Sequence, residues 1–594
     1  MFENSRVVFE YFVGNEKKVE TFKTDFENGD FKTIISWDNV EGGHKYALSI
    51  MPKKEIVIEK LYVEEKYSYS SNSKIYVNGY QSWTDSREFF VDENLKDIAW
   101  PAKLLNKKYN FKNYGDYTFT KYSKRKGDFH GFTYSYIRND EELTLIGSLT
   151  ERNGYTIIKE SVKDGLLIIE KECQGLHIDS KYNAFELVSL NGEENFVFDK
   201  YFEYMGVNKP KGQPMTGWTS WYNYYQDISE DIILENLNNF SEMNKNIEIY
   251  QIDDGFQTAV GDWLSIDKNK FPRGMKPLVD EIKAKGYKSG LWLAPFSCET
   301  NSEIFKNKKH WILKDKNGNL VHGGNNWSGF YALDLYNAEV REYIRKVFDV
   351  VLNEWGFDMV KLDFLYSVCL VPRRDKTRGQ VMTEAMEFLR ECVGDKLILG
   401  CGVPLGPAFG LVDYCRIGCD VGLDWNDTVI MQMTHRERIS TLNAINNTIG
   451  RKHLDGRAFF NDPDVFLLRE DNIKLTREQK KTLSVVNYIF GSLLFTSDNI
   501  SKYDKGHHNL FDGIMQVKEK EILSVDRDKE GFVKVLYLEE NIKHLALINL
   551  SEKETVVKNS YGKLTEVSFD EKANKEFNDR NIAVQGFESR IFVV

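Results

Sequence analysis

Cysteine and proline are both in short supply in this chain of 594 residues, and glycine is present only at an ordinary level. Its seven cysteines are odd in number and contain no C-x-x-C pair, which argues against a disulfide framework and favours a reducing compartment. With 11 prolines and 42 glycines, the chain has too little of either residue for a collagenous or low-complexity protein. A folded globular protein is therefore expected.

Segments that would direct the chain into or across a membrane are also missing. A membrane-spanning helix needs about 20 consecutive apolar residues, and the best candidate, VVNYIFGSLLF at 485–495, is shorter. The first residues, MFENSRVVFEYFVGNEKK, lack a basic region followed by an apolar stretch, so no secretory signal is expected. We expect a cytoplasmic protein with no membrane partner.

Positive charge is in deficit, because 79 lysines and arginines face 90 aspartates and glutamates, for a formal net charge of −11. Proteins that bind duplex nucleic acid need a basic stripe that displaces counterions from the phosphates. The basic clusters at 306–310 and 373–376 are too short to form one. No nucleic-acid partner is expected, and the acidic surplus is read as a solubility feature.

Strand-like and helix-like patterns divide the chain into three parts. Residues 1–204 contain short β-branched and aromatic runs separated by turn residues, which predict an N-terminal β-sandwich domain. The stretch MGVNKPKGQP at 205–214 is typical of a linker. Residues 214–512 alternate strands with helices, whereas 513–594 return to strands and predict a small C-terminal β domain.

The central part contains eight β/α units. Their apolar strand segments lie at 216–221, 247–255, 287–296, 357–366, 396–402, 414–420, 458–464 and 492–498. Eight such units predict a (β/α)₈ TIM barrel. An open doubly wound sheet is the alternative, but that fold usually carries a glycine-rich phosphate loop, and no G-x-G-x-x-G follows the first strand.

Aspartates follow five of these strands. They are Asp253 and Asp254, Asp363, Asp420, Asp462 and Asp464, and Asp498. The carboxyl ends of barrel strands form the catalytic face, so we expect these carboxylates to converge on one cavity. The same strand ends carry tryptophans, whose flat rings would suit a sugar: Trp218, Trp221, Trp292 and Trp425.

Converging carboxylates suit divalent metal binding, phosphoryl transfer or glycoside hydrolysis. Transition-metal sites usually recruit histidine, but none of the ten histidines lies at a strand end or in an H-E-x-x-H motif. Phosphoryl transfer normally requires a phosphate-binding loop, which is missing. Glycoside hydrolysis needs two carboxylates on opposite sides of a sugar ring. We expect a glycosidase without metal or cofactor, and metal-dependent isomerase or aldolase chemistry is the alternative.

A series of motifs accompanies these strand ends. They are QIDDG at 251–255, GDW at 261–263, GLWLAPF at 290–296, KLD at 361–363, CGVP at 401–404, RIGCD at 416–420 and NDPD at 461–464. In this order they resemble the motifs of the retaining α-galactosidases (melibiases) of glycoside hydrolase family 36, as does NGYQSW at 78–83. The resemblance implies an N-terminal β-supersandwich, a (β/α)₈ barrel and a C-terminal antiparallel β-sandwich.

The resemblance also implies that Asp363 is the nucleophile and Asp420 the general acid/base. Lys361, two residues before Asp363 on the same strand face, would place positive charge near the nucleophile and keep it ionised. Asp420 would need surroundings that raise its pKa, because it must be protonated before it can donate. Asp424, four residues further along, is a rival acid.

Substrate-binding residues are implied in the same way. Asp253 and Asp254 would hold the 4- and 6-hydroxyls of galactose, with Lys361 at the 3- or 4-hydroxyl. Losing such hydrogen bonds in a dry pocket is costly, so these groups would select the sugar.

The remaining implied binding residues surround the ring. Arg416 and Cys401 match positions near the 2-hydroxyl, whereas Trp292 and Trp83 would wall the pocket. Because Trp83 belongs to the N-terminal part, it must reach across a domain interface to do so.

Together these expectations describe a retaining exo-α-galactosidase. It would remove terminal α-linked galactose from small oligosaccharides such as melibiose or raffinose by double displacement through a covalent galactosyl-enzyme. An α-N-acetylgalactosaminidase, a galactosyl transferase and a non-catalytic sugar-binding protein stay open as alternatives. The sequence leaves the aglycone preference, the pH optimum and the choice between monomer and homo-oligomer undecided.

Overall fold

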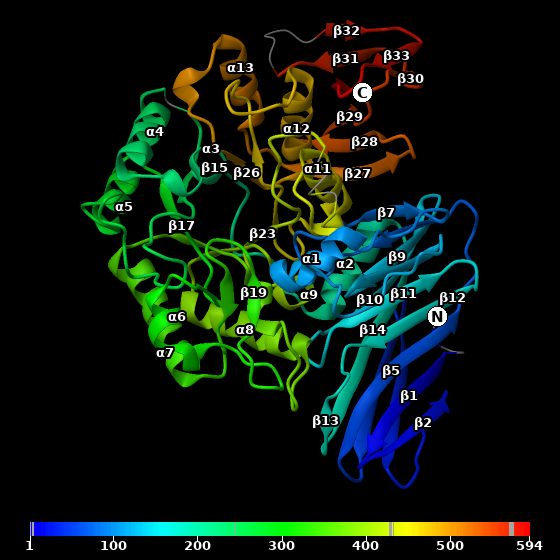
Figure 1. Cartoon of the computed structure of the whole chain (residues 1–594). Coiled ribbons are helices and arrows are strands. Elements are labelled where there is room, and N and C mark those ends of the chain that lie inside the picture. Colours follow the sequence, from blue (N-terminus) through cyan, green and yellow to red (C-terminus); the bar gives the residue numbers. More distant parts are fainter. Residues whose placement is uncertain (1, 3–4, 244, 427–430, 432, 570–574) are drawn as a thin grey trace.

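Three regions follow one another along the chain in the computed structural model, which describes residues 2, 5–243, 245–426, 431, 433–569 and 575–594. Figure 1 shows long N-terminal strands in blue and cyan, a ring of green to orange strands and helices, and a C-terminal group of strands in orange and red. The boundaries that the sequence suggests for these regions stay predictions.

Two antiparallel seven-stranded sheets form the N-terminal region. The first sheet comprises β1 (Arg6–Val13), β2 (Glu16–Phe22), β5 (Ile56–Lys66), β8 (Asp128–Phe132), β11 (Thr156–Ser161), β12 (Leu166–Lys171) and β13 (His177–Ile178). The second comprises β3 (Phe31–Val40), β4 (Gly43–Pro52), β6 (Lys74–Val77), β7 (Arg87–Phe90), β9 (Tyr134–Asn139), β10 (Glu142–Ser148) and β14 (Tyr182–Gly192).

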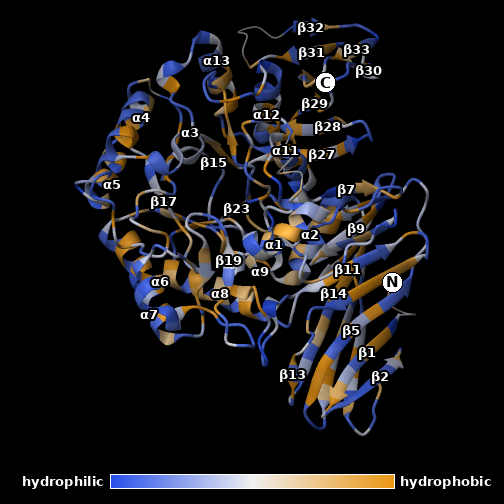
Figure 2. Ribbon diagram, viewed as in Figure 1, coloured by the Kyte–Doolittle hydropathy of each residue, from blue (hydrophilic) through white to orange (hydrophobic). Residues whose placement is uncertain are grey.

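The sandwich follows from alternation along these strands. In β12 buried and half-buried residues alternate at every position, as expected for a strand with one face on a core. Figure 2 shows hydrophobic and hydrophilic residues sharing the long strands β1 and β5. Side chains of both sheets, among them Phe9, Ile50 and Leu187, meet in one apolar core. The region also contains helices α1 (Trp100–Tyr109) and α2 (Glu194–Met205), which the strand pattern does not predict.

The central region is built on a parallel nine-stranded sheet. Its strands are β15 (Met215–Thr219), β16 (Ile249–Ile252), β17 (Lys288–Leu293), β21 (Met359–Leu362), β22 (Leu397–Gly400), β23 (Tyr414–Arg416), β24 (Phe460–Asp462), β25 (Val465–Phe466) and β26 (Leu493–Thr496). Each of the eight predicted strand segments overlaps one of them. A hydrogen bond of 3.0 Å from Ser492 N to Asn461 O joins the last strand to β24. The predicted barrel fold is confirmed.

Helices follow most strands of this sheet. They are α3 (Trp221–Tyr224), α4 (Glu230–Glu242), α5 (Met275–Ala284), α6 (Glu303–Asn307), α7 (Ala338–Asp349), α8 (Arg378–Val393), α9 (Leu405–Ala408), α11 (Thr441–Gly450), α12 (Arg477–Phe490) and α13 (Lys505–Ile514). Local sequence fixes their starts: Ser229 caps α4, and Thr476 with Gln479 forms a capping box on α12. A small antiparallel sheet is inserted: β18 (Ser297–Glu299), β19 (His322–Gly324) and β20 (Phe330–Ala332).

The C-terminal region contains two antiparallel sheets, as predicted. The larger comprises β27 (Lys520–Arg527), β28 (Phe532–Glu539), β29 (Ile542–Asn549), β31 (Leu564–Val567), β32 (Lys575–Phe577) and β34 (Ser589–Val593), and the smaller β30 (Thr555–Lys558) and β33 (Asn581–Val584). Across the described ranges of the whole chain, no helix combines the length and apolar character needed to cross a membrane.

The loop between β6 and β7 fastens the N-terminal region to the barrel. Ser82 N donates to Val403 O at 2.9 Å. The fully buried Arg451 donates from Nη1 to the carbonyls of Ser82 and Ile417, and from Nη2 to Gln81 O at 3.0 Å. One arginine therefore holds the NGYQSW loop against the strand that carries RIGCD.

Replacing Arg451 with Gln should destabilise the protein by about 3 kcal/mol, because three buried carbonyls lose their donor at roughly 1 kcal/mol each. Urea unfolding of the variant and wild type measures this difference. The matched control is Arg374→Gln, whose exposed pair with Glu55 should contribute little to stability. Equal effects of the two substitutions would contradict a clamping role for Arg451.

Candidate active site

A cavity of about 460 Å³ opens at the carboxyl ends of the barrel strands. Residues that directly follow β16, β21 and β23 line it, as the sequence predicts. Loops of the barrel and residues of the N-terminal region complete its wall. The following side chains of the predicted site line it: Asp253, Asp254, Lys361, Asp363, Asp420, Trp292 and Trp83.

The carboxylate of Asp363 lies directly after β21 and is 8% exposed. It accepts hydrogen bonds from Trp292 Nε1 at 3.1 Å and from the backbone N of Phe364 at 2.7 Å. The pKa of Asp363 is raised overall, and burial is the largest cause. The charge of Lys361 and the hydrogen bond from Trp292 oppose this increase, whereas the charge of Asp420 adds to it. The group is a buried, pre-oriented carboxylate.

Lys361 forms its ion pair with Asp253 at 2.8 Å. Burial alone would lower the pKa of Lys361, but the charge of Asp253, together with smaller contributions from Cys401 and Asp363, outweighs it, and the pKa is raised. The lysine is therefore a permanent cation. As the sequence suggests, the charge of Lys361 lowers the pKa of Asp363. Lys361 nevertheless donates its hydrogen bond to Asp253 and not to Asp363.

Asp254 is held by three donors. Gln226 Nε2 and Trp327 Nε1 donate to its Oδ2 at 2.9 and 2.8 Å, and Gln257 Nε2 donates to its Oδ1 at 2.5 Å. Burial raises the pKa of Asp254, and these hydrogen bonds oppose the increase. Trp327 adopts a left-handed backbone conformation with φ of 57°, a strained state that is typical of functional sites. Asp254 thus lies in a fixed orientation at the cavity wall.

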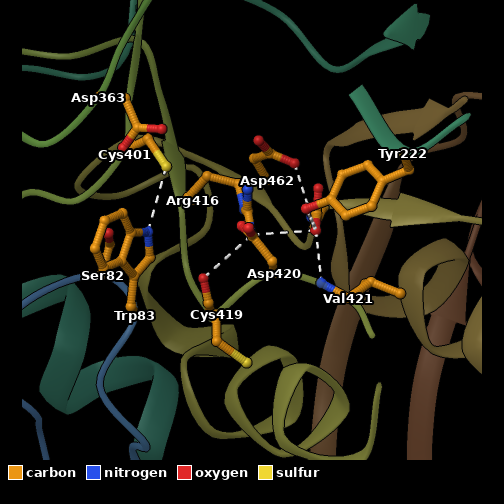
Figure 3. Close-up of polar contacts among 12 residues, drawn as sticks. Ser82, Trp83, Tyr222, Asp363, Cys401, Arg416, Cys419, Asp420, Val421 and Asp462 are labelled. Carbon is orange, nitrogen blue, oxygen red and sulfur yellow. Dashed lines mark hydrogen bonds and ion pairs between the residues drawn. The ribbon is translucent and has the colours of Figure 1, made fainter. Parts of the chain in front are cut away.

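Asp420 is oriented by a buried arginine (Figure 3). Arg416 Nη2 lies 3.0 Å from Asp420 Oδ1 and 3.1 Å from Asp464 Oδ2. Arg416 is buried, whereas the Asp420 side chain is 33% exposed. Asp464 also accepts from Val421 N at 2.8 Å and from the hydroxyl of Tyr222. Arg416 therefore lies behind Asp420 and anchors a carboxyl that solvent can reach. This positive neighbour is the opposite of the surroundings that we expected for a proton donor.

Trp83 does reach the barrel across the domain interface. Its Nε1 donates to Cys401 Sγ at 3.4 Å (Figure 3), and its ring meets Phe364 edge-on at 5.2 Å. Burial raises the pKa of the Cys401 thiol well above its ordinary value, so this group stays neutral. Gly402 has φ of 52°, and a Cβ there would lie 2.9 Å from Trp83 Cζ2 and 3.0 Å from Asp363 Oδ1. Only glycine fits at this position.

Two of the four predicted tryptophans lie elsewhere. Trp221 and Trp292 line the cavity, but Trp218 stacks on Tyr250 at 4.4 Å, and Trp425 packs against Phe587 at 5.1 Å. A tryptophan at a strand end can point into the core as well as into the barrel mouth, and the sequence does not distinguish these orientations.

The convergence of acids from five strands is also only partly correct, because the predicted acids that line the cavity follow β16, β21 and β23, whereas Asp462 and Asp464 do not line it. Asp498 is fully buried and pairs with Arg469 at 3.1 Å outside the cavity, where it stabilises neighbouring backbone. Asp424, the rival acid, pairs with Lys474 at 3.1 Å and does not line the cavity. Asp498 therefore stabilises the fold, and Asp424 forms a partly exposed ion pair.

Several cavity residues carry no strand-end signal in the sequence. They are Trp327, Gln226, Tyr114 and Glu437. Glu437 accepts from Thr84 Oγ1 at 2.8 Å and Tyr117 hydroxyl at 2.7 Å, and burial raises its pKa to about 7. Within the described residues, no cluster of three or more His, Cys, Asp or Glu side chains is arranged to hold a metal ion.

Comparison with known proteins adds independent information. A family model described as Melibiase matches residues 209–389. The α-galactosidase of Escherichia coli is 28% identical over 151 residues, which cover 24% of this chain and 20% of that protein. The matched stretch thus spans about a fifth of that relative's length.

Solved structures resemble almost the whole chain. The α-galactosidase TtGalA of Thermus thermophilus, in complex with p-nitrophenyl α-D-galactopyranoside, aligns with a TM-score of 0.69 at 24% identity over 88% of this chain and 98% of that one. A family 36 α-galactosidase of Geobacillus stearothermophilus aligns with a TM-score of 0.64 at 13% identity over 99% and 86% of the two chains. At these identities the structures show the shared fold.

Motifs, family model and fold therefore agree, and this chain is similar to the α-galactosidases of glycoside hydrolase family 36.

Proposed function

We propose that this protein is a retaining exo-α-galactosidase. The observation that carries the proposal is the buried Asp363 carboxylate, which two N–H donors orient, in the same cavity as the arginine-anchored Asp420. Two carboxyls in one sugar-sized cavity are the minimum equipment for glycoside hydrolysis. The family relationship supports the same reaction.

The first step would be attack of an Asp363 oxygen on the anomeric carbon of galactose. The bond to the leaving group breaks as Asp420 donates its proton to the glycosidic oxygen, which leaves a galactosyl ester on Asp363. The donors Trp292 Nε1 and Phe364 N orient the attacking carboxylate. The partial exposure of Asp420 allows it to reach the departing oxygen at the mouth of the cavity.

The second step would reverse these roles. Asp420, now a carboxylate, takes a proton from water, and the water oxygen replaces Asp363 at the anomeric carbon. Two inversions give net retention of configuration. Arg416 stabilises the Asp420 anion formed between the steps, because its guanidinium lies 3.0 Å from that carboxyl.

Galactose selectivity is assigned to the charged inner wall. Asp253 and Asp254 supply acceptors, and Lys361 supplies a donor, for hydroxyls on the far side of the ring. Trp292 and Trp83 provide ring faces, while Arg416 and Cys401 lie behind the wall and shape it. The structure of TtGalA in complex with stachyose supports a small oligosaccharide with terminal α-galactose as substrate. A cytoplasmic location stays a prediction.

Replacing Asp363 with Ala should lower kcat by about 10⁴-fold or more, because no nucleophile remains. Azide should restore part of the activity and yield a β-galactosyl azide, since it enters from the face that the carboxylate leaves. Product analysis by NMR measures this. Asp424→Asn serves as control and should retain wild-type activity. Normal turnover by Asp363→Ala would end the proposal.

The acid limb of the pH profile should report Asp363. This group must be ionised to attack, and burial raises its pKa, so kcat/KM falls as the pH drops through a value above that of an ordinary aspartate. Trp292→Phe removes a hydrogen bond to the charged form, raises the pKa further and should move the limb to higher pH. An unchanged limb, or one moved to lower pH, would show that Trp292 does not tune the nucleophile.

A further inference from the structure

An aromatic segment of the N-terminal region reaches the rim of the cavity. Tyr109, Phe111 and Tyr114 lie at the end of α1 and in the short 3₁₀ helix that follows it, and all three line the cavity. The rings of Tyr109 and Phe111 stack with centroids 5.4 Å apart and an interplanar angle of 22°. Together with Tyr114, these stacked rings form an aromatic strip that the proposed catalytic steps do not use.

The side chains that line the cavity become more buried from this strip toward the inner wall. Asp253, Asp254 and Trp292 at the inner wall are each 2% exposed. Tyr109 and Phe111 are half-buried, as is the rest of the strip. In the proposed reaction, a galactose held by the buried acids would direct its anomeric substituent outward, because Asp420, which donates to the leaving oxygen, is partly exposed.

The strip is held in place before any ligand binds. The hydroxyl of Tyr114 donates to Asn326 Oδ1 at 2.6 Å, and Asn113 Nδ2 donates to His322 O at 3.0 Å. On the other side, Gln81 Nε2 donates to Tyr114 O at 2.6 Å. The segment is therefore fixed both to the small barrel sheet and to the NGYQSW loop. A preorganised surface binds without an ordering cost.

We propose that Tyr109 and Phe111 form the leaving-group subsite, on which the second hexose ring of the substrate stacks. This inference rests on the proposed α-galactosidase function and deepens it. The subsite would give substrates with a sugar beyond the galactose an advantage over those without one. The N-terminal region, rather than the barrel, would then determine leaving-group preference.

The surroundings of the strip favour a sugar over a lipid or a plain aryl group. Asn325, Asn326 and Thr434 also line the cavity and contribute amide and hydroxyl groups to its lining. A pyranose presents C–H groups on its face and hydroxyls around its edge, which matches a cavity lined by both aromatic rings and polar side chains.

The test compares two substrates in a variant that carries Tyr109→Ala and Phe111→Ala. Raffinose places a second hexose at the rim, whereas α-galactosyl fluoride has a leaving group too small to reach it. The ratio of kcat/KM for raffinose to that for the fluoride should fall by about tenfold or more when two ring contacts are lost. Trp100→Ala is the matched control: this ring lies on the same helix, is 71% exposed and does not line the cavity, so the ratio should stay at the wild-type value.

A pair of leucine substitutions, Tyr109→Leu with Phe111→Leu, separates stacking from bulk and guards against misfolding. These variants keep apolar volume but remove the flat faces, so the ratio should again fall. Equal losses on both substrates, or an unaltered ratio in both double variants, would overturn the subsite. If the wild-type protein cleaves neither substrate, the proposed function itself fails, which is a distinct outcome.

Discussion

Burial of the Asp363 carboxylate is the constraint on which the rest of the site depends. An ionised carboxylate in an apolar setting is costly unless donors and positive charge compensate it. Here Trp292 Nε1 and Phe364 N donate to its two oxygens, and Lys361 contributes charge from a distance. Phe364 adopts a left-handed conformation, with φ of 52°, directly beside this carboxylate. Local strain thus accompanies the orientation of a reactive group.

The same constraint explains why the barrel alone does not complete the wall of the site. Trp83 of the N-terminal region covers Phe364 and Cys401, and it can approach because residue 402 is a glycine. Arg451 fixes the loop that carries Trp83 through three backbone carbonyls. Without this wall, water would reach Asp363 from the side and weaken every electrostatic interaction that holds it. The electrostatics of the Asp363 carboxylate therefore depend on how the N-terminal region docks onto the barrel.

Sequence reasoning was most successful where function and strand geometry coincide. Asp253, Asp254, Asp363 and Asp420 line one cavity as predicted, because they follow apolar strands and parallel strands bring their carboxyl ends together, whereas their roles stay predictions. The β/α alternation predicted the barrel for the same reason.

The predictions failed where orientation or long loops decide the outcome. Trp218 follows the same pattern as Trp221 but points into the core. Trp327 and Glu437 come from loops whose path depends on tertiary contacts, and their neighbours in sequence carry no periodic signal. Helix α1, which leads into the aromatic strip, lies in a region of strands and could not be predicted from their pattern.

The central claim is that galactose becomes covalently attached to Asp363. A galactosyl fluoride analogue, fluorinated on the ring to slow the second step, should accumulate the ester, and mass spectrometry of the digested protein should locate one fluorogalactosyl group on Asp363. Attachment to Asp420 or to another residue would contradict the account. So would turnover of α-galactosyl substrates to β-galactose without any trapped ester, because that product requires a single inversion instead of a covalent intermediate.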